Sequence, residues 1–150
     1  MASKVAINGL GRIGRSLLKL VIDHPAFDLV AVNDLVDVEN LAYLVRYDTV
    51  YGRYAKSVLI DDQHLVVDGR RLRTLSNPDP LALPWKELGV ELVFECTGAL
   101  KQREDLEKHV RAGARVVLLS APASGGEVET VVHGANEAEG ASSIISCASC

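Results

Sequence analysis

Short apolar runs rich in β-branched residues alternate along this chain with segments in which apolar residues recur every three or four positions. The first run, residues 4–8 (KVAIN), has the length and composition of a strand. In residues 13–23, Ile13, Leu17 and Leu20 are spaced to share one face of a helix. The two patterns then repeat, with a strand predicted at residues 28–34 and a helix at residues 38–46.

The middle of the chain changes character. Residues 57–61, 64–69 and 70–75 are short strand-like runs joined by Asp-Asp and Asp-Gly turns, which predicts a small antiparallel insertion. The strand–helix rhythm then resumes, with a helix at residues 100–113 that Gly113 closes. A strand and turn are predicted at residues 90–98, and further strands at residues 114–122, 129–136 and 142–150. This order predicts an α/β fold with a doubly wound, mostly parallel sheet, as in a Rossmann dinucleotide-binding domain.

Composition narrows the class further. Hydrophobic residues make up 48% of the 150 residues but aromatic residues only 5%, so the core is expected to consist of Val, Leu, Ile and Ala. The formal net charge of -4 gives no overall attraction to nucleic acid or to an anionic membrane. No apolar run is long enough for a membrane span. Three cysteines do not form a secreted disulfide framework, which favours a reducing, cytoplasmic compartment.

Three glycines follow the first predicted strand in the sequence VAINGLGRIGR. Gly9 can make the tight turn, Gly11 leaves no side chain between backbone and a pyrophosphate, and Gly14 allows close packing of helix on strand. The start of the helix offers free N–H groups to phosphate. Asp34, 20 residues after Gly14, can accept hydrogen bonds from ribose hydroxyls and would repel a 2′-phosphate. The pattern therefore favours NAD over NADP, although a flavin or another nucleotide could use the same layout, as could a glycine turn without a ligand.

Two arginines accompany the glycines. Arg12 lies between the second and third glycine and is the better candidate for a phosphate contact. For Arg15, a phosphate role and a solvated position on a surface helix are equally good interpretations.

The cysteines near the end allow three interpretations. Cys147 and Cys150 have the C-x-x-C spacing of redox pairs and of half zinc sites, but no second pair of ligands accompanies them, so no metal site is expected. A nucleophilic thiol at the carboxyl end of a strand is the third possibility. Cys96 is expected to be a buried small apolar residue, and His109, like the other histidines, an ordinary surface or packing residue.

Seven motifs together resemble the amino-terminal half of the glyceraldehyde-3-phosphate dehydrogenase family. They occur in the family's order and spacing and extend over essentially all 150 residues. The motifs are INGLGRIGR (7–15), VNDL (32–35), RYDTVYG (46–52), DPLALPW (79–85), ECTG (95–98), LLSAP (118–122) and ISCASC (145–150).

The resemblance implies a chemistry. Members of the family oxidise an aldehyde with NAD(P) and inorganic phosphate to an acyl phosphate, through a cysteine thioester, and Cys150 matches the catalytic cysteine. Pro78 stands where the family commonly has a basic residue near the adenine, and Cys147 where most members have Asn. The resemblance implies that NAD is bound by Gly9, Gly11, Arg12, Ile13, Gly14, Asp34, Leu35, Pro78, Thr97, Gly98 and Ser120.

The resemblance also implies that residues 1–150 are the NAD-binding domain. The catalytic domain, with its histidine, its phosphate-binding residues and its C-terminal helix, would follow residue 150. We therefore expect this chain alone to bind NAD without turnover, and the phosphorylated aldehyde substrate to bind only to the full-length enzyme, a homotetramer in this family. Two alternatives remain open: a domain of the related erythrose-4-phosphate dehydrogenase, and a dinucleotide-binding module without catalysis.

Overall fold

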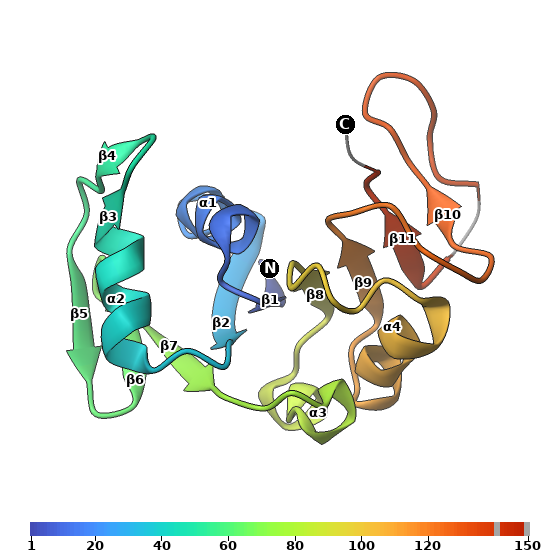
Figure 1. Ribbon diagram of the computed structural model, residues 1–150. Helices are drawn as coiled ribbons and strands as arrows, with labels where there is room; N and C mark the ends of the chain where they lie inside the picture. The colour runs from blue at the N-terminus through green and yellow to red at the C-terminus, as the bar shows by residue number, and fades with distance from the viewer. Residues whose placement is uncertain (140–141, 149–150) are drawn as a thin grey trace.

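Nine strands form one continuous sheet in the computed structural model, which describes residues 1–139 and 142–148 (Figure 1). Two more strands, β3 and β4, form a separate small hairpin. The strands are β1 (Ser3–Asn8), β2 (Phe27–Asn33), β3 (Tyr47–Asp48), β4 (Gly52–Arg53), β5 (Val58–Asp61), β6 (His64–Val67), β7 (Arg70–Leu75), β8 (Leu92–Glu95), β9 (Val116–Leu119), β10 (Glu129–Thr130) and β11 (Ile144–Ser146). The helices are α1 (Arg12–Val21), α2 (Val38–Arg46), the 3-10 helix η1 (Pro80–Ala82), α3 (Trp85–Leu88) and α4 (Arg103–Arg111).

The strand order confirms a doubly wound sheet. The order is β10-β11-β9-β8-β1-β2-β7-β6-β5, and every neighbouring pair from β10 to β7 is parallel. Numbered along the chain, the six strands from β7 to β11 follow the order 3-2-1-4-5-6 of the Rossmann fold. The order reverses between β1 and β8, and in such sheets the ligand binds at the carboxyl ends of the strands at this point.

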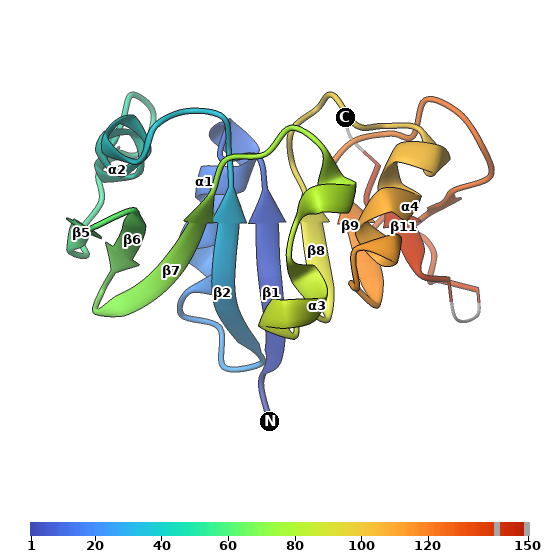
Figure 2. The ribbon, with the colours of Figure 1, turned by 90° about the horizontal axis from the view of Figure 1, so that it is seen from below.

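Helices cover both faces of the sheet, as Figure 2 shows. On one face α1 and α2 pack on a core that includes Val5 and Ile7 of β1. On the other face the small side chains of Ala6 and Ala31 make room for Trp85, which is fully buried at the start of α3. Helix α4 packs on β9 and β11 on this second face. None of the helices that the structure describes is long and apolar enough to cross a membrane.

The antiparallel segment is present, but it is part of the main sheet. Strands β5 and β6 extend the sheet as an antiparallel edge, whereas β7 pairs antiparallel with β6 and parallel with β2. The third run of the predicted insertion is therefore also the third strand of the Rossmann order. The predicted strand at residues 129–136 is reduced to Glu129–Thr130, because the chain turns away after pairing with β11.

Candidate functional site

A cleft of about 440 Å³ opens at the carboxyl ends of β1, β2 and β8, next to the point where the strand order reverses. It therefore lies where the fold predicts a ligand. Residues from four separate segments of the chain line it: Asn8, Gly9, Gly11, Asn33, Asp34, Leu35, Asn77, Pro78, Thr97, Ala99 and Leu100.

Two of the three glycines are required by close backbone packing. Gly9 has φ +90°, and a Cβ added there would lie 2.7 Å from the backbone nitrogen of Thr97. A Cβ added to Gly14 would lie 1.9 Å from the carbonyl oxygen of Gly9. The first turn of α1 is thus packed directly against the strand-to-helix turn, as the sequence predicted for Gly14, and a larger residue there would displace the turn.

Gly11 has a different role, because its Cβ position is open. It has φ -64°, caps the start of α1, and an added Cβ would have no heavy atom within 4 Å. Gly11 nevertheless lines the cleft, so a side chain there would extend into the space above the start of α1. The first N–H groups of a helix have no partner within the helix and carry its positive dipole end. These are the features of a phosphate site.

Asp34 is held in place at the edge of the cleft by two backbone groups. Its Oδ2 accepts a hydrogen bond from the N–H of Leu10 (2.6 Å), and its Oδ1 accepts one from the N–H of Val36 (3.0 Å). The carboxylate therefore braces the glycine turn from the neighbouring strand. A carboxylate oxygen has two lone pairs, so each oxygen keeps capacity for one further donor such as a ribose hydroxyl.

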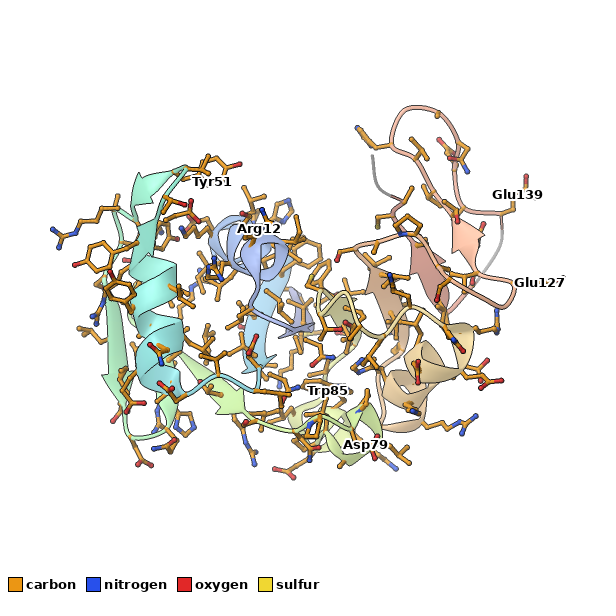
Figure 3. All side chains as sticks on the ribbon, viewed as in Figure 1. Arg12, Tyr51, Asp79, Trp85, Glu127 and Glu139 are labelled. Atoms are coloured by element: carbon orange, nitrogen blue, oxygen red, sulfur yellow. The ribbon has the colours of Figure 1, made fainter. Side chains whose placement is uncertain are left out.

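The other predicted cofactor residues divide into two groups. Leu35, Pro78 and Thr97 line the cleft together with Gly9, Gly11 and Asp34. The remaining ones lie outside its lining: Arg12, Ile13, Gly14, Gly98 and Ser120. Arg12 and Ile13 are exposed on the first turn of α1, where Figure 3 labels Arg12.

Arg15 faces the protein rather than the solvent. Its Nη1 donates to the carbonyl oxygen of Leu10 (2.8 Å), and its Nε is buried. The guanidinium of Arg15 thus stabilises the glycine turn by a hydrogen bond to its backbone. Neither sequence interpretation of Arg15 anticipated this contact, because it depends on the direction in which the side chain leaves the helix.

The cysteines show no sign of thiol activation among the described residues. Cys96 is buried, and burial raises the pKa of its thiol to about 11. Cys147 is exposed as a residue, but partial desolvation of its sulfur raises the pKa of this thiol as well. Both are free, and Cys96 is the buried residue that the sequence predicted. Cys150, the predicted nucleophile, lies outside the described residues.

A buried polar cluster that sequence analysis missed extends inward from the floor of the cleft, where Asn8 and Asn33 line it: Asn8, Asn33, Trp85, Glu95 and His109. One feature of the sequence could have indicated this cluster: the apolar strands β1, β2 and β8 each end in a polar residue. His109 was expected at the surface or in ordinary packing. It is a packing residue, fully buried between Trp85 and Glu95, and it has a hydrogen bond to each that the sequence did not indicate.

The fold and the cleft define the chain as a dinucleotide-binding domain of the Rossmann class. A family model described as "Glyceraldehyde 3-phosphate dehydrogenase, NAD binding domain" matches residues 3–103. The chain belongs to this family, and its cofactor is NAD.

Curated relatives of the chain carry the same family name. The chain is 44% identical to glyceraldehyde-3-phosphate dehydrogenase of Thermotoga maritima over 99% of its own length and 45% of the relative's. It is 43% identical to the enzyme of the same name from Clostridium pasteurianum and 44% identical to that from Geobacillus stearothermophilus, again over 45% of each relative. The chain thus spans less than half the length of the curated relatives it matches.

Proposed function

We propose that these 150 residues are the NAD-binding domain of a phosphorylating glyceraldehyde-3-phosphate dehydrogenase. One observation carries this proposal: the cleft brings the glycine turn, the start of α1 and the Asp34 carboxylate together at the reversal of strand order. Backbone N–H groups at the start of α1 bind the pyrophosphate, and Asp34 accepts hydrogen bonds from the adenosine ribose. Bound NAD supplies the hydride acceptor for oxidation of the aldehyde.

We assign Cys150 the role of nucleophile on the basis of its match to the family's catalytic cysteine. Its sulfur adds to the aldehyde carbon, and loss of hydride from that carbon leaves a thioester. Inorganic phosphate then cleaves the thioester, which releases the acyl phosphate and restores the thiol. The residues that bind phosphate and move the proton belong to the catalytic domain, which we place after residue 150.

We also infer the protein's setting from its family and composition. From the family we infer a homotetramer that acts on a phosphorylated aldehyde. From the described cysteines, Cys96 and Cys147, which are free thiols, we infer a cytoplasmic location.

The test compares residues 1–150 with the longer protein to which they belong. Each is incubated with NAD, phosphate and glyceraldehyde 3-phosphate or erythrose 4-phosphate, and NADH is followed by absorbance. We expect turnover only in the longer protein, faster with the triose substrate, and its loss in Cys150→Ser. A higher kcat/KM for the tetrose would indicate the related erythrose-4-phosphate enzyme, and no NADH with either substrate would contradict the proposed activity.

A further inference from the structure

Three polar side chains form a row across the sheet at the floor of the cleft, where two of them, Asn8 and Asn33, line it. Asn33, Asn8 and Glu95 are the last residues of β2, β1 and β8, and Asn8 pairs in register with both of the others. The Asn33 Nδ2 donates to Asn8 Oδ1 (2.6 Å), and the Asn8 Nδ2 donates to Glu95 Oε2 (2.6 Å). All three are buried, with exposures of 4%, 2% and 0%.

Each end of this row is hydrogen-bonded to a different wall of the cleft. The Asn33 side chain accepts from the N–H of Asn77 and donates to its carbonyl oxygen, both at 2.9 Å. Asn77 and the adjacent Pro78 line one side of the cleft. At the other end, Glu95 Oε1 accepts from the N–H of Thr97 (2.8 Å) and from its hydroxyl, and Thr97 lines the opposite side.

His109 is the fourth hydrogen-bond donor to the Glu95 carboxylate. The Trp85 Nε1–H donates to His109 Nδ1 (2.9 Å), so this nitrogen is the unprotonated acceptor and the ring proton lies on Nε2. That proton is directed at Glu95 Oε2, 3.0 Å away. The carboxylate thus receives hydrogen bonds from Asn8, His109, and the N–H and hydroxyl of Thr97. A buried polar network in which every member is paired is rigid.

We propose that Asn33 and Glu95 are positioning residues that hold the two walls of the cleft in place before the dinucleotide binds. This inference rests on the proposed NAD-binding function and adds a reason for affinity: a preformed cleft avoids the entropy cost of ordering its walls during binding. The Asn33 position tolerates fewer side chains than the Glu95 position, because the Asn33 amide both donates to and accepts from the backbone of Asn77. Only a side-chain amide of this length can make both hydrogen bonds to Asn77.

The test measures wall order and affinity separately in Asn33→Ala and in the nearly isosteric Asn33→Asp, which keeps the acceptor but loses both donors. In the chain without NAD, we expect faster hydrogen exchange of the Asn77 amide in Asn33→Ala and a smaller increase in Asn33→Asp, which keeps the acceptor for that N–H. We expect the Kd for NAD to rise about tenfold in Asn33→Ala. The control is Leu65→Ala in β6, a fully buried core position outside this network and outside the cleft lining. It should lower the thermal unfolding temperature but leave the Kd and the Asn77 exchange rate unchanged.

A double-mutant cycle with Pro78→Ala shows whether Asn33 acts through the wall. If it does, the losses of affinity in Asn33→Ala and Pro78→Ala are not additive, because the second substitution alters a wall already released. Unchanged exchange at Asn77, or additive losses, would contradict the positioning role and indicate only a direct contact with the ligand. Absence of NAD binding by the unsubstituted chain would instead contradict the proposed function, so the two failures are distinguished.

Discussion

Gly11 is the glycine of the turn that close packing does not require, and its proposed role is in binding. Its φ of -64° suits any amino acid, and an added Cβ would contact nothing within 4 Å. A valine there would nevertheless project into the cleft where the pyrophosphate is proposed to lie. We predict that Gly11→Val weakens NAD binding by roughly 100-fold, about 2.7 kcal/mol, while the circular dichroism spectrum stays unchanged.

Gly125 supplies the matched control for this substitution. It also has no atom within 4 Å of an added Cβ and no positive φ, but it does not line the cleft. Gly125→Val should bind NAD with the affinity of the unsubstituted chain. Tight NAD binding by a folded Gly11→Val variant would place the phosphates elsewhere.

Asp34 carries a negative charge and also accepts hydrogen bonds from two backbone N–H groups. Two substitutions separate the effect of the charge from that of the hydrogen bonds. Asp34→Asn removes the charge but keeps one acceptor for the N–H of Leu10 or Val36, whereas Asp34→Ala also releases the glycine turn. The negative charge is the feature that would repel a 2′-phosphate. We predict that Asp34→Asn narrows the preference for NAD over NADP about tenfold, as measured by paired calorimetric titrations, and that Asp34→Ala weakens both ligands. A preference that is unaltered in Asp34→Asn would show that the charge does not select the cofactor.

Among the elements, the contact of α1 with the turn after β1 is the tightest that the glycines create. The hypothetical Cβ of Gly14 lies 1.9 Å from the Gly9 carbonyl oxygen, a backbone atom that cannot move without displacing the turn. We predict that Gly14→Ala lowers the free energy of unfolding in urea by roughly 2–3 kcal/mol, at the upper end of overpacking costs. Gly11→Ala is the comparison within the same turn and should cost well under half as much. Equal stability of the two variants would contradict the close packing of helix and strand.

Sequence pattern predicted most elements because their signals are local. The helix at residues 38–46 matches α2 in both bounds, and the glycine turn follows its strand as expected. The predicted strand at residues 129–136 was mostly wrong because apolar residues such as Val132 do not by themselves create a pairing partner. Strand identity at the sheet edge depends on the neighbouring strand, which local pattern does not contain.

The site was only partly predictable for the same physical reason. Gly9, Gly11 and Asp34 belong to a motif of fixed spacing, so sequence alone brings them together. The row of Asn33, Asn8 and Glu95 arises only when three strands pair in register, and residues that lie far apart along the chain then exchange hydrogen bonds. Spacing along the sequence therefore cannot predict this row until the order of the strands in the sheet is known.

For the whole molecule, burial of Cys96 makes stability depend on alkaline pH. An ordinary thiol ionises with a pKa of 9.0, but burial raises the pKa of Cys96 to about 11 in the folded chain. Above pH 9 the unfolded chain therefore loses a proton that the folded chain keeps. The stabilisation is complete below pH 9 and is lost as the pH rises towards 11.

We predict that the free energy of unfolding in urea falls between pH 8 and pH 10 and that Cys96→Ala shows a smaller fall. This range lies below the ordinary lysine value of 10.5, so the raised pKa of Lys56, which donates to Asp23 and Asp68, contributes little. Burial raises the pKa of the Cys147 thiol in the same direction, and it remains in both chains. Identical pH slopes in the two chains would show that the Cys96 thiol is not protected by burial.

Other cavities exist among the described residues, and the two that compete with the cleft are lined by residues 46–47 and 53–59 and by residues 131, 133–138 and 147, so the location of NAD can be decided directly. The measurement is a titration of the isotope-labelled chain with NAD, followed by two-dimensional NMR of the backbone amides. We predict that the shifted amides cluster around the cleft, in residues 9–14, 34–36, 77 and 97–100, with saturation at one NAD per chain. Shifts concentrated at either of the other cavities, or no shifts at all, would contradict the assignment of this cleft as the NAD site.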